Sequence, residues 1–246
     1  MTYSRTIPDF TPLGKSDITT YHNSMSFFSQ LFSHPLIAIA SLFAILIALT
    51  VHEFSHALAG FLLGDNTAKH LGRLSLNPLA HLDPVGFILM LTAGFGWAKP
   101  VPYNPYNLKW PKWGPVVVGL AGPASNFFLA ILSFSLTVLC IPLLGYSNLF
   151  IVFLISCFTI NLMLCFFNLI PLPPLDGSSV LLALLAHPRY VNARYFIMQT
   201  GPKMLLAIIF IDMFTNANII GSILRLPIEL FLQAAHFFVK ITPIYL

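Results

Sequence analysis

Charged side chains are scarce in this sequence. Asp, Glu, Lys and Arg make up 8% of its 246 residues, whereas about a quarter is usual in a soluble protein. Hydrophobic residues make up 57%, and several apolar runs exceed the ~18 residues that span a bilayer. The composition excludes a water-soluble globule. It predicts an all-α membrane protein, a polytopic helical bundle of about five to six membrane segments with a short re-entrant or hairpin insertion.

Other features are also missing. The net charge of +4 is scattered over short loops and forms no basic stripe of the kind that would indicate nucleic-acid binding. We therefore expect these charges to orient the protein in a membrane. Cys140, Cys157 and Cys165 lie in apolar stretches without Cys-x-x-Cys spacing, which favours packing over disulfides or a sulfur-ligated metal. Residues 1–34 lack an apolar h-region, so we expect no cleavable signal peptide.

The most informative stretch is His-Glu-Phe-Ser-His at residues 52–56, inside the apolar run 35–63. On a helix, His52 and His56 lie one turn apart on the same face, a spacing that suits two imidazoles binding one zinc ion. Glu53 is turned about 100° from His52, so it can reach a water at the metal without being a ligand. That is the place of a general base.

The apolar setting strengthens this interpretation. An ionisable group at the middle of a membrane helix costs on the order of 3 kcal/mol, so a cluster of them needs a compensating purpose, and a metal supplies one. The alternative is a polar cluster that only packs helices together.

Three apolar runs are long enough to span a membrane, at about 35–63, 114–143 and 149–170. The run 85–97 is too short and contains glycines, so we expect a re-entrant loop or hairpin shielded by neighbouring helices. Two further apolar segments follow, at about 203–214 and 218–240. Residues 1–34 have no sustained hydrophobic periodicity, so we expect a mobile or surface-lying tail. We divide the chain into an N-terminal tail (1–34), a core (35–186) and C-terminal membrane helices (187–246).

A proline-rich segment follows the third run. It reads Asn168-Leu-Ile-Pro-Leu-Pro-Pro-Leu-Asp176-Gly177, and its prolines must unwind the helix. An extended segment at membrane depth makes sense if it lines a cavity, brings Asp176 to the histidines and offers an edge to a substrate strand. The alternative is an interfacial turn in which Asp176 caps the next helix.

Three protein ligands plus a water are the open arrangement of a catalytic zinc. His52, His56 and Asp176 would supply the three. His70 and His81 are weaker candidates for a ligand. Asn126, which follows several small residues in the second run, is expected to serve packing.

The zinc motif, Gly122-Pro-Ala-Ser-Asn126 and the segment from Asn168 to Gly177 together resemble the site-2 protease family of intramembrane zinc metalloproteases. Residues 72–86 and 95–102 are similar to its short bacterial branch, and the likeness covers about residues 35–186. The regulatory domains of the longer members, such as a PDZ domain, and a membrane span before the zinc helix are not apparent.

The resemblance implies that His52, His56 and Asp176 bind one Zn²⁺ per subunit, that Glu53 is the catalytic base, and that Asn168 holds substrate or stabilises the oxyanion. It implies a multi-pass protein of the cell membrane, in bacteria the inner membrane, that cuts transmembrane protein substrates. The distribution of Lys and Arg over the loops predicts that the active site lies nearer the cytoplasm. Two rivals remain: another membrane zinc peptidase, such as the prenyl-protein proteases, whose third ligand is a glutamate, and an inactive scaffold or chaperone that binds transmembrane helices.

Overall fold

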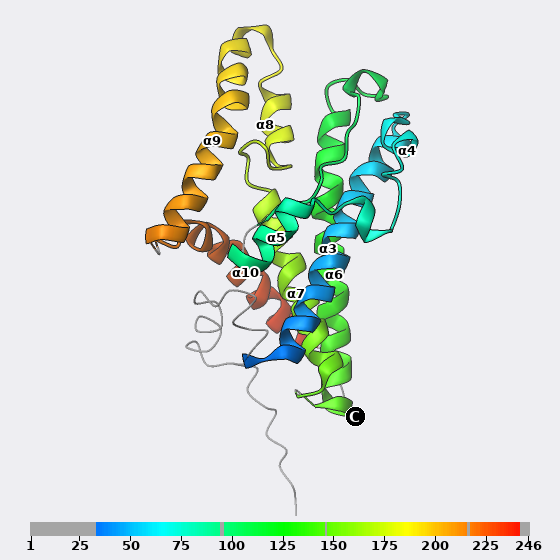
Figure 1. The fold of residues 1–246 in the computed structure, drawn as a ribbon, viewed down its shortest axis with the longest axis vertical. Helices are drawn as coiled ribbons and strands as arrows, with labels where there is room; N and C mark the ends of the chain where they lie inside the picture. The colour runs from blue at the N-terminus through cyan, green and yellow to red at the C-terminus, as the bar shows by residue number, and fades with distance from the viewer. Residues whose placement is uncertain (1–32, 94–95, 146, 216, 242–246) are drawn as a thin grey trace, which may run out of the picture.

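The computed structural model describes residues 33–93, 96–145, 147–215 and 217–241, and within these ranges the chain is helical and has no β-strand (Figure 1). The predicted all-α membrane class is confirmed. The expected N-terminal tail lies almost wholly outside the described residues. In chain order the α-helices are α3 (Pro35–Leu62), α4 (Thr67–His70), α5 (Pro84–Ala93), α6 (Gly114–Leu144), α7 (Leu149–Asn168), α8 (Ser178–Leu184), α9 (Val191–Thr215) and α10 (Ile219–Ile241). Short 3₁₀ turns lie at Pro78–Ala80, Pro105–Asn107 and Pro188–Tyr190.

Helices α3, α6 and α7 pack against one another and form the centre of the molecule (Figure 1). Their bounds lie within two residues of the three predicted apolar runs. Small residues allow the close approach: Ala38, Ala44 and Ala48 of α3 are fully buried. Ser41 of α3 also meets Ser156 of α7, with 3.3 Å between their hydroxyl oxygens.

Four helices of the described chain are long and apolar enough to cross a membrane: α3, α6, α7 and the segment Pro188–Thr215 that contains α9. Many large apolar side chains on them face outward, among them Phe43, Phe128 and Leu139. A lipid environment would cover these surfaces. α10 is also long but is not among these four, so the predicted count of five segments is reached when α10 is included, and six when α5 is included as well.

Helix α3 ends just past the zinc motif, in a turn that needs glycine. Gly64 has φ of +104°, the left-handed region that side chains other than glycine rarely adopt. The Gly64 N–H donates to Phe61 O, and the Asp65 N–H donates to Gly60 O, which is the Schellman pattern that stops a helix. The chain therefore turns back toward the bundle directly after residue 62.

The run predicted to be a short insertion contains α5, which at 10 residues is only about 15 Å long. An isolated antiparallel bridge between Leu82 and Ala98 closes the chain on either side of it. Gly86 permits this closure, because a Cβ there would lie 3.0 Å from the carbonyl carbon of Trp97. The insertion thus enters and leaves on the same side of the bundle.

The C-terminal helices pack against the central bundle through α10. α10 contacts both α7 and α9, and Asp212 near the end of α9 accepts the Ile219 and Ile220 N–H groups at 2.6 and 2.8 Å. Asp212 therefore caps α10. Arg225 and Glu229 form an exposed ion pair along α10 at 2.7 Å, worth little in stability.

Candidate metal centre

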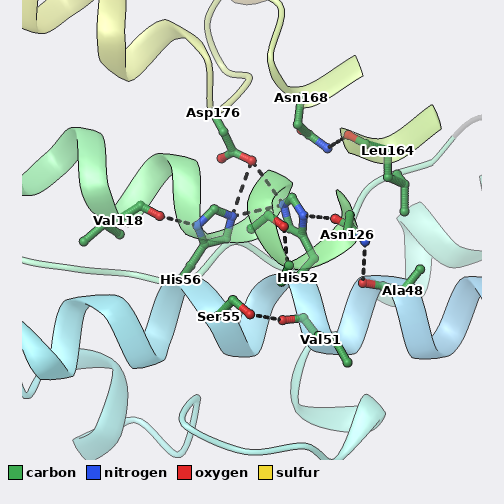
Figure 2. A network of polar contacts seen from close by, with 12 residues as sticks. Ala48, Val51, His52, Ser55, His56, Val118, Asn126, Leu164, Asn168 and Asp176 are labelled. Atoms are coloured by element: carbon green, nitrogen blue, oxygen red, sulfur yellow. Dashed lines mark hydrogen bonds and ion pairs between the residues drawn. The ribbon is translucent and has the colours of Figure 1, made fainter. Parts of the chain in front are cut away.

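Three side chains from two distant parts of the chain converge between α3 and the loop that follows α7 (Figure 2). The Nε2 atoms of His52 and His56 are 3.0 Å apart. Asp176 Oδ2 lies 3.1 Å from the first and 3.4 Å from the second. The two rings meet edge to face with centroids 4.6 Å apart. The structure therefore brings together the three residues that the sequence proposed as ligands.

The second nitrogen of each ring is held by α6. His52 Nδ1–H donates to Asn126 Oδ1 at 2.5 Å, and His56 Nδ1–H donates to the Val118 carbonyl at 2.7 Å. In a neutral imidazole, a hydrogen on Nδ1 leaves a lone pair on Nε2. Both lone pairs consequently point at the same place.

The third group brings another lone pair. This group is the carboxylate of Asp176, on the loop that follows α7. Its Oδ2 is buried and receives no hydrogen bond from any described residue. Three acceptors at 3.0 to 3.4 Å repel one another unless a cation lies between them.

The spacing of the acceptors suits zinc. A tetrahedral ion with ligand distances of about 2.0–2.1 Å separates its ligand atoms by about 3.3 Å, close to the observed sides of the triangle. Two imidazoles and a carboxylate are ligands that Zn²⁺ accepts, and three of them leave a fourth position open. The residues present therefore fit a catalytic rather than a structural zinc.

Asn126 does more than pack. It is fully buried, and its Nδ2 donates to Asn161 Oδ1 of α7 at 2.7 Å and to Ala48 O of α3 at 3.2 Å. Asn161 in turn donates to Cys157 O. One amide thus joins three helices and orients the His52 ring. Figure 2 shows its contacts with His52 and Ala48. The sequence reading missed Asn161, although a lone amide inside an apolar helix is a signal for such a role.

Gly119 and Gly122 make room for the centre on the face of α6. A Cβ on Gly122 would lie 2.6 Å from His52 Cε1 and would also overlap the His56 ring. A Cβ on Gly119 would lie 2.6 Å from Ser179 Oγ. The small residues expected to serve helix packing therefore serve it at the metal centre itself.

The proline-rich loop carries Asp176 as the sequence predicted. α7 ends at Asn168, and the Gly177 N–H donates to Asn168 O at 2.7 Å, which closes the loop at its base. A side chain at Gly177 would collide with the Leu169 carbonyl group. On its other side the loop packs on α9, where Leu175 meets Leu205 and Ile209. Asp176 is therefore held from both α7 and α9.

Glu53 is buried on α3 next to the ligands, and its carboxylate makes no hydrogen bond within the described chain. Two loop residues lie near enough to sense the centre. The negative charge of Glu53 raises the pKa of Arg73, although burial lowers it more. Burial raises the pKa of Tyr103, and the negative charge of Asp176 raises it further. These loops therefore run close to the centre, and the 3₁₀ turn Pro78–Ala80 within them contacts α3.

The remaining candidates lie outside the ligand cluster. Asn168 Nδ2 donates to Leu164 O of its own helix, so the side chain is beside the centre rather than in it (Figure 2). His70 is exposed. His81 is buried but bonds Ser75 O through Nε2 at 2.7 Å. Neither histidine belongs to the metal-binding group.

Comparison with known proteins agrees with this centre. Residues 144–209 match the model of peptidase family M50. The chain is 45% identical over 142 residues to "Putative zinc metalloprotease YwhC" of Bacillus subtilis, a match that covers 56% of this chain and 65% of that protein. It is 34% identical over 97 residues to "Putative zinc metalloprotease Rip2" of Mycolicibacterium smegmatis, covering 37% of each.

The chain thus spans less than two thirds of the curated relatives that it matches. No solved structure matches it. The named relatives and the cluster of His52, His56 and Asp176 support Zn²⁺ as the cofactor.

Proposed function

We propose that this chain, which belongs to the site-2 protease family of zinc metalloproteases, is an intramembrane endopeptidase that hydrolyses peptide bonds within or near transmembrane helices of membrane proteins. One observation carries the proposal. Three lone pairs converge at a buried point inside a bundle of apolar helices, with the Glu53 carboxylate beside them. A scaffold that only bound helices would not need this arrangement.

The residues of the centre have separate roles in hydrolysis. His52, His56 and Asp176 would hold one zinc ion, which when bound polarises the peptide carbonyl and makes a water more acidic. Glu53 takes a proton from that water and passes it to the leaving amine. No covalent bond forms between chain and substrate. Asn126 and the Val118 carbonyl keep the two imidazoles in the tautomer that this requires.

Asn168 is proposed to contact the substrate. Only one of its two amide hydrogens is needed for the bond to Leu164 O. The other is available to a substrate carbonyl, or to the oxyanion as it forms. Its backbone carbonyl at the same time holds the base of the loop that carries Asp176.

The substrate class follows from the location of the centre. A peptide bond inside a helix is hydrogen-bonded and sterically covered, so cutting requires local unwinding. The proline-rich loop between α7 and α8 offers backbone groups that are not used by a helix, along which an unwound segment can lie. The proposed purpose is regulated intramembrane proteolysis or clearance of membrane proteins.

We place the protein in the cell membrane, in bacteria the inner membrane, with the centre nearer the cytoplasm. The cations of the loops next to the centre, Lys69, Arg73, Lys99, Lys109 and Lys112, favour that side. We retain residues 35–186 as the protease core and 187–246 as supporting membrane helices, because α9 packs on the loop that carries Asp176.

The test is cleavage of single-span substrates by the purified, zinc-loaded chain in detergent, with the Glu53→Gln variant as the comparison. Cleavage by the wild type alone supports the proposal. A zinc-loaded wild type that bound these substrates but cut none of them would favour the scaffold.

A further inference from the structure

One buried cation near the metal centre has no acidic partner. Arg73 is 5% exposed, and no carboxylate of the described chain lies within ion-pair distance of it. Its Nη2 donates to the Lys99 carbonyl, and its Nε has no hydrogen-bond partner among the described residues. A buried guanidinium with an unused donor is costly unless an anion joins it.

The backbone holds Arg73 firmly in this position. α4 ends in a Schellman turn, in which the Gly72 N–H donates to Lys69 O and the Arg73 N–H donates to Ala68 O at 2.8 Å. Gly72 has φ of +70°. Arg73 is therefore placed by a defined turn, and its burial is a feature of the fold.

Arg73 lines a pocket of about 420 Å³. Lys99 supplies a second cation, and the other walls are apolar, formed by Leu71, Pro100, Val101 and Pro102. The pocket thus combines two positive groups with walls that suit the aliphatic part of a side chain. A fully hydrated ion would gain nothing from such walls.

The pocket lies beside α3, the helix that carries His52 and His56. The Lys99 N–H donates to His81 O at 2.8 Å, and the 3₁₀ turn Pro78–Ala80, which directly precedes His81, contacts α3. The charge of Glu53 acts on Arg73, and Tyr103, which directly follows the pocket residue Pro102, senses the charge of Asp176. These charges agree with a position of the pocket close to the centre. A substrate segment held at the zinc can place a nearby side chain in the pocket.

We propose that this pocket is a specificity site that binds the carboxylate of an acidic substrate side chain close to the cleaved bond. Arg73 supplies a charged donor, and Lys99 adds a second positive charge to the lining. This inference rests on the proposed function, because it takes the ligand of the pocket to be part of a substrate. A lipid phosphate fits less well, because the apolar walls formed by Leu71, Pro100, Val101 and Pro102 suit the methylene groups of a side chain rather than a hydrated headgroup.

The experiment uses one single-span substrate with Glu, or its neutral counterpart Gln, placed in turn at each of the four positions on either side of the cleaved bond. Cleavage by the wild type is measured as kcat/KM. Binding is measured separately with zinc-loaded Glu53→Gln protein, so that this measurement does not depend on cleavage. If nothing is cut, the proposed function fails while the binding arm still tests the pocket.

At one position or more, we expect Glu to be bound and cut at least about tenfold better than Gln, which corresponds to about 1.4 kcal/mol. Arg73→Gln should bring that ratio close to one. Arg73→Lys keeps the charge without the planar fork and should give an intermediate ratio. Lys112→Gln, at an exposed cation outside the pocket, should leave the ratio unchanged.

A ratio near one at every position in the wild type would overturn the proposal. So would an Arg73→Gln variant that weakened the Glu and Gln substrates equally, because Arg73 would then only support Glu53 or the loop. The binding arm is repeated in vesicles with and without phosphatidylglycerol. Arg73-dependent binding of that lipid, with no preference between Glu and Gln, would assign the pocket to a lipid phosphate and contradict the proposal.

Discussion

At the scale of single residues, the metal centre depends on groups that never touch the metal. Asn126 and the Val118 carbonyl fix the hydrogens of the two imidazoles on Nδ1. Gly122 leaves the space into which both rings project. The two histidines could be found from the sequence because spacing within a helix is local information, and Asp176 could be proposed because the prolines before it must unwind the helix. These supports lie about 70 residues away in the chain, and only packing reveals them.

We expect Gly122→Ala to lower bound zinc at least about tenfold, the range seen when the support of a metal ligand is lost. The new Cβ would lie 2.6 Å from His52 Cε1 and would overlap His56, so the rings or the helices must shift. Bound zinc in the purified protein is the measurement.

Gly60→Ala on α3 is the matched control. A Cβ there meets nothing within 4 Å, and alanine favours the helix over glycine by about 1 kcal/mol. This variant should keep its zinc. Normal zinc content in Gly122→Ala would show that the close packing of α6 on the rings is not required.

At the scale of elements, one carboxylate fastens the loop after α5 to the end of α3. Asp65 is 1% exposed, and it accepts hydrogen bonds from the Thr67 N–H and hydroxyl, the Asn104 N–H and the Asn107 amide. Burial raises the pKa of Asp65, but these hydrogen bonds lower it more, to below its ordinary value. Asp65 is therefore an ionised anchor that holds this loop to the end of α3.

We expect Asp65→Asn to lower the free energy of unfolding at pH 7 by about 2 kcal/mol, because hydrogen bonds to a charged group are lost or mispaired. A group whose pKa is lowered on folding stabilises the protein fully above its ordinary pKa of about 3.9, and this contribution is lost as the pH falls through the folded value. The difference between wild type and variant should therefore shrink below about pH 4. Thermal unfolding in detergent measures it.

Asp83→Asn is the control, since the Asp83 side chain accepts only the Gly86 N–H at 2.9 Å among the described contacts. Its loss should be smaller. A difference between Asp65→Asn and wild type that stayed constant from pH 7 to pH 3 would mean that ionisation of Asp65 does not matter.

The long helices were predictable because apolar runs and prolines mark their limits. α3, α6 and α7 begin and end within two residues of the predicted bounds. The short run 85–97 could be excluded as a span on length alone. Its closure by the Leu82–Ala98 bridge could not be predicted, because it depends on a contact between two loops. The start of α9 at Val191 was also missed, because the first turns of this helix are polar and the apolar run begins only at 203.

At the scale of the whole molecule, the proposed orientation in the membrane rests on the distribution of cations. The loops next to the centre carry several Lys and Arg residues, whereas the turn between α6 and α7, residues 145–148, has none. We expect a cysteine introduced by Ser147→Cys to react with a membrane-impermeant reagent from the outside only. All three native cysteines should first be replaced. Labelling from the cytoplasmic side would reverse the proposed orientation.

The most direct test compares Glu53→Gln with wild type, measuring bound zinc and cleavage of a single-span substrate in the same purified samples. The substitution keeps the shape of the side chain and leaves His52, His56 and Asp176 in place, so the variant should keep its zinc. Without the base, hydrolysis should fall by at least about 10²-fold, and uncut substrate should stay bound. Equal cleavage by the two proteins at equal zinc content would contradict the assignment of Glu53 as the base, and with it the mechanism.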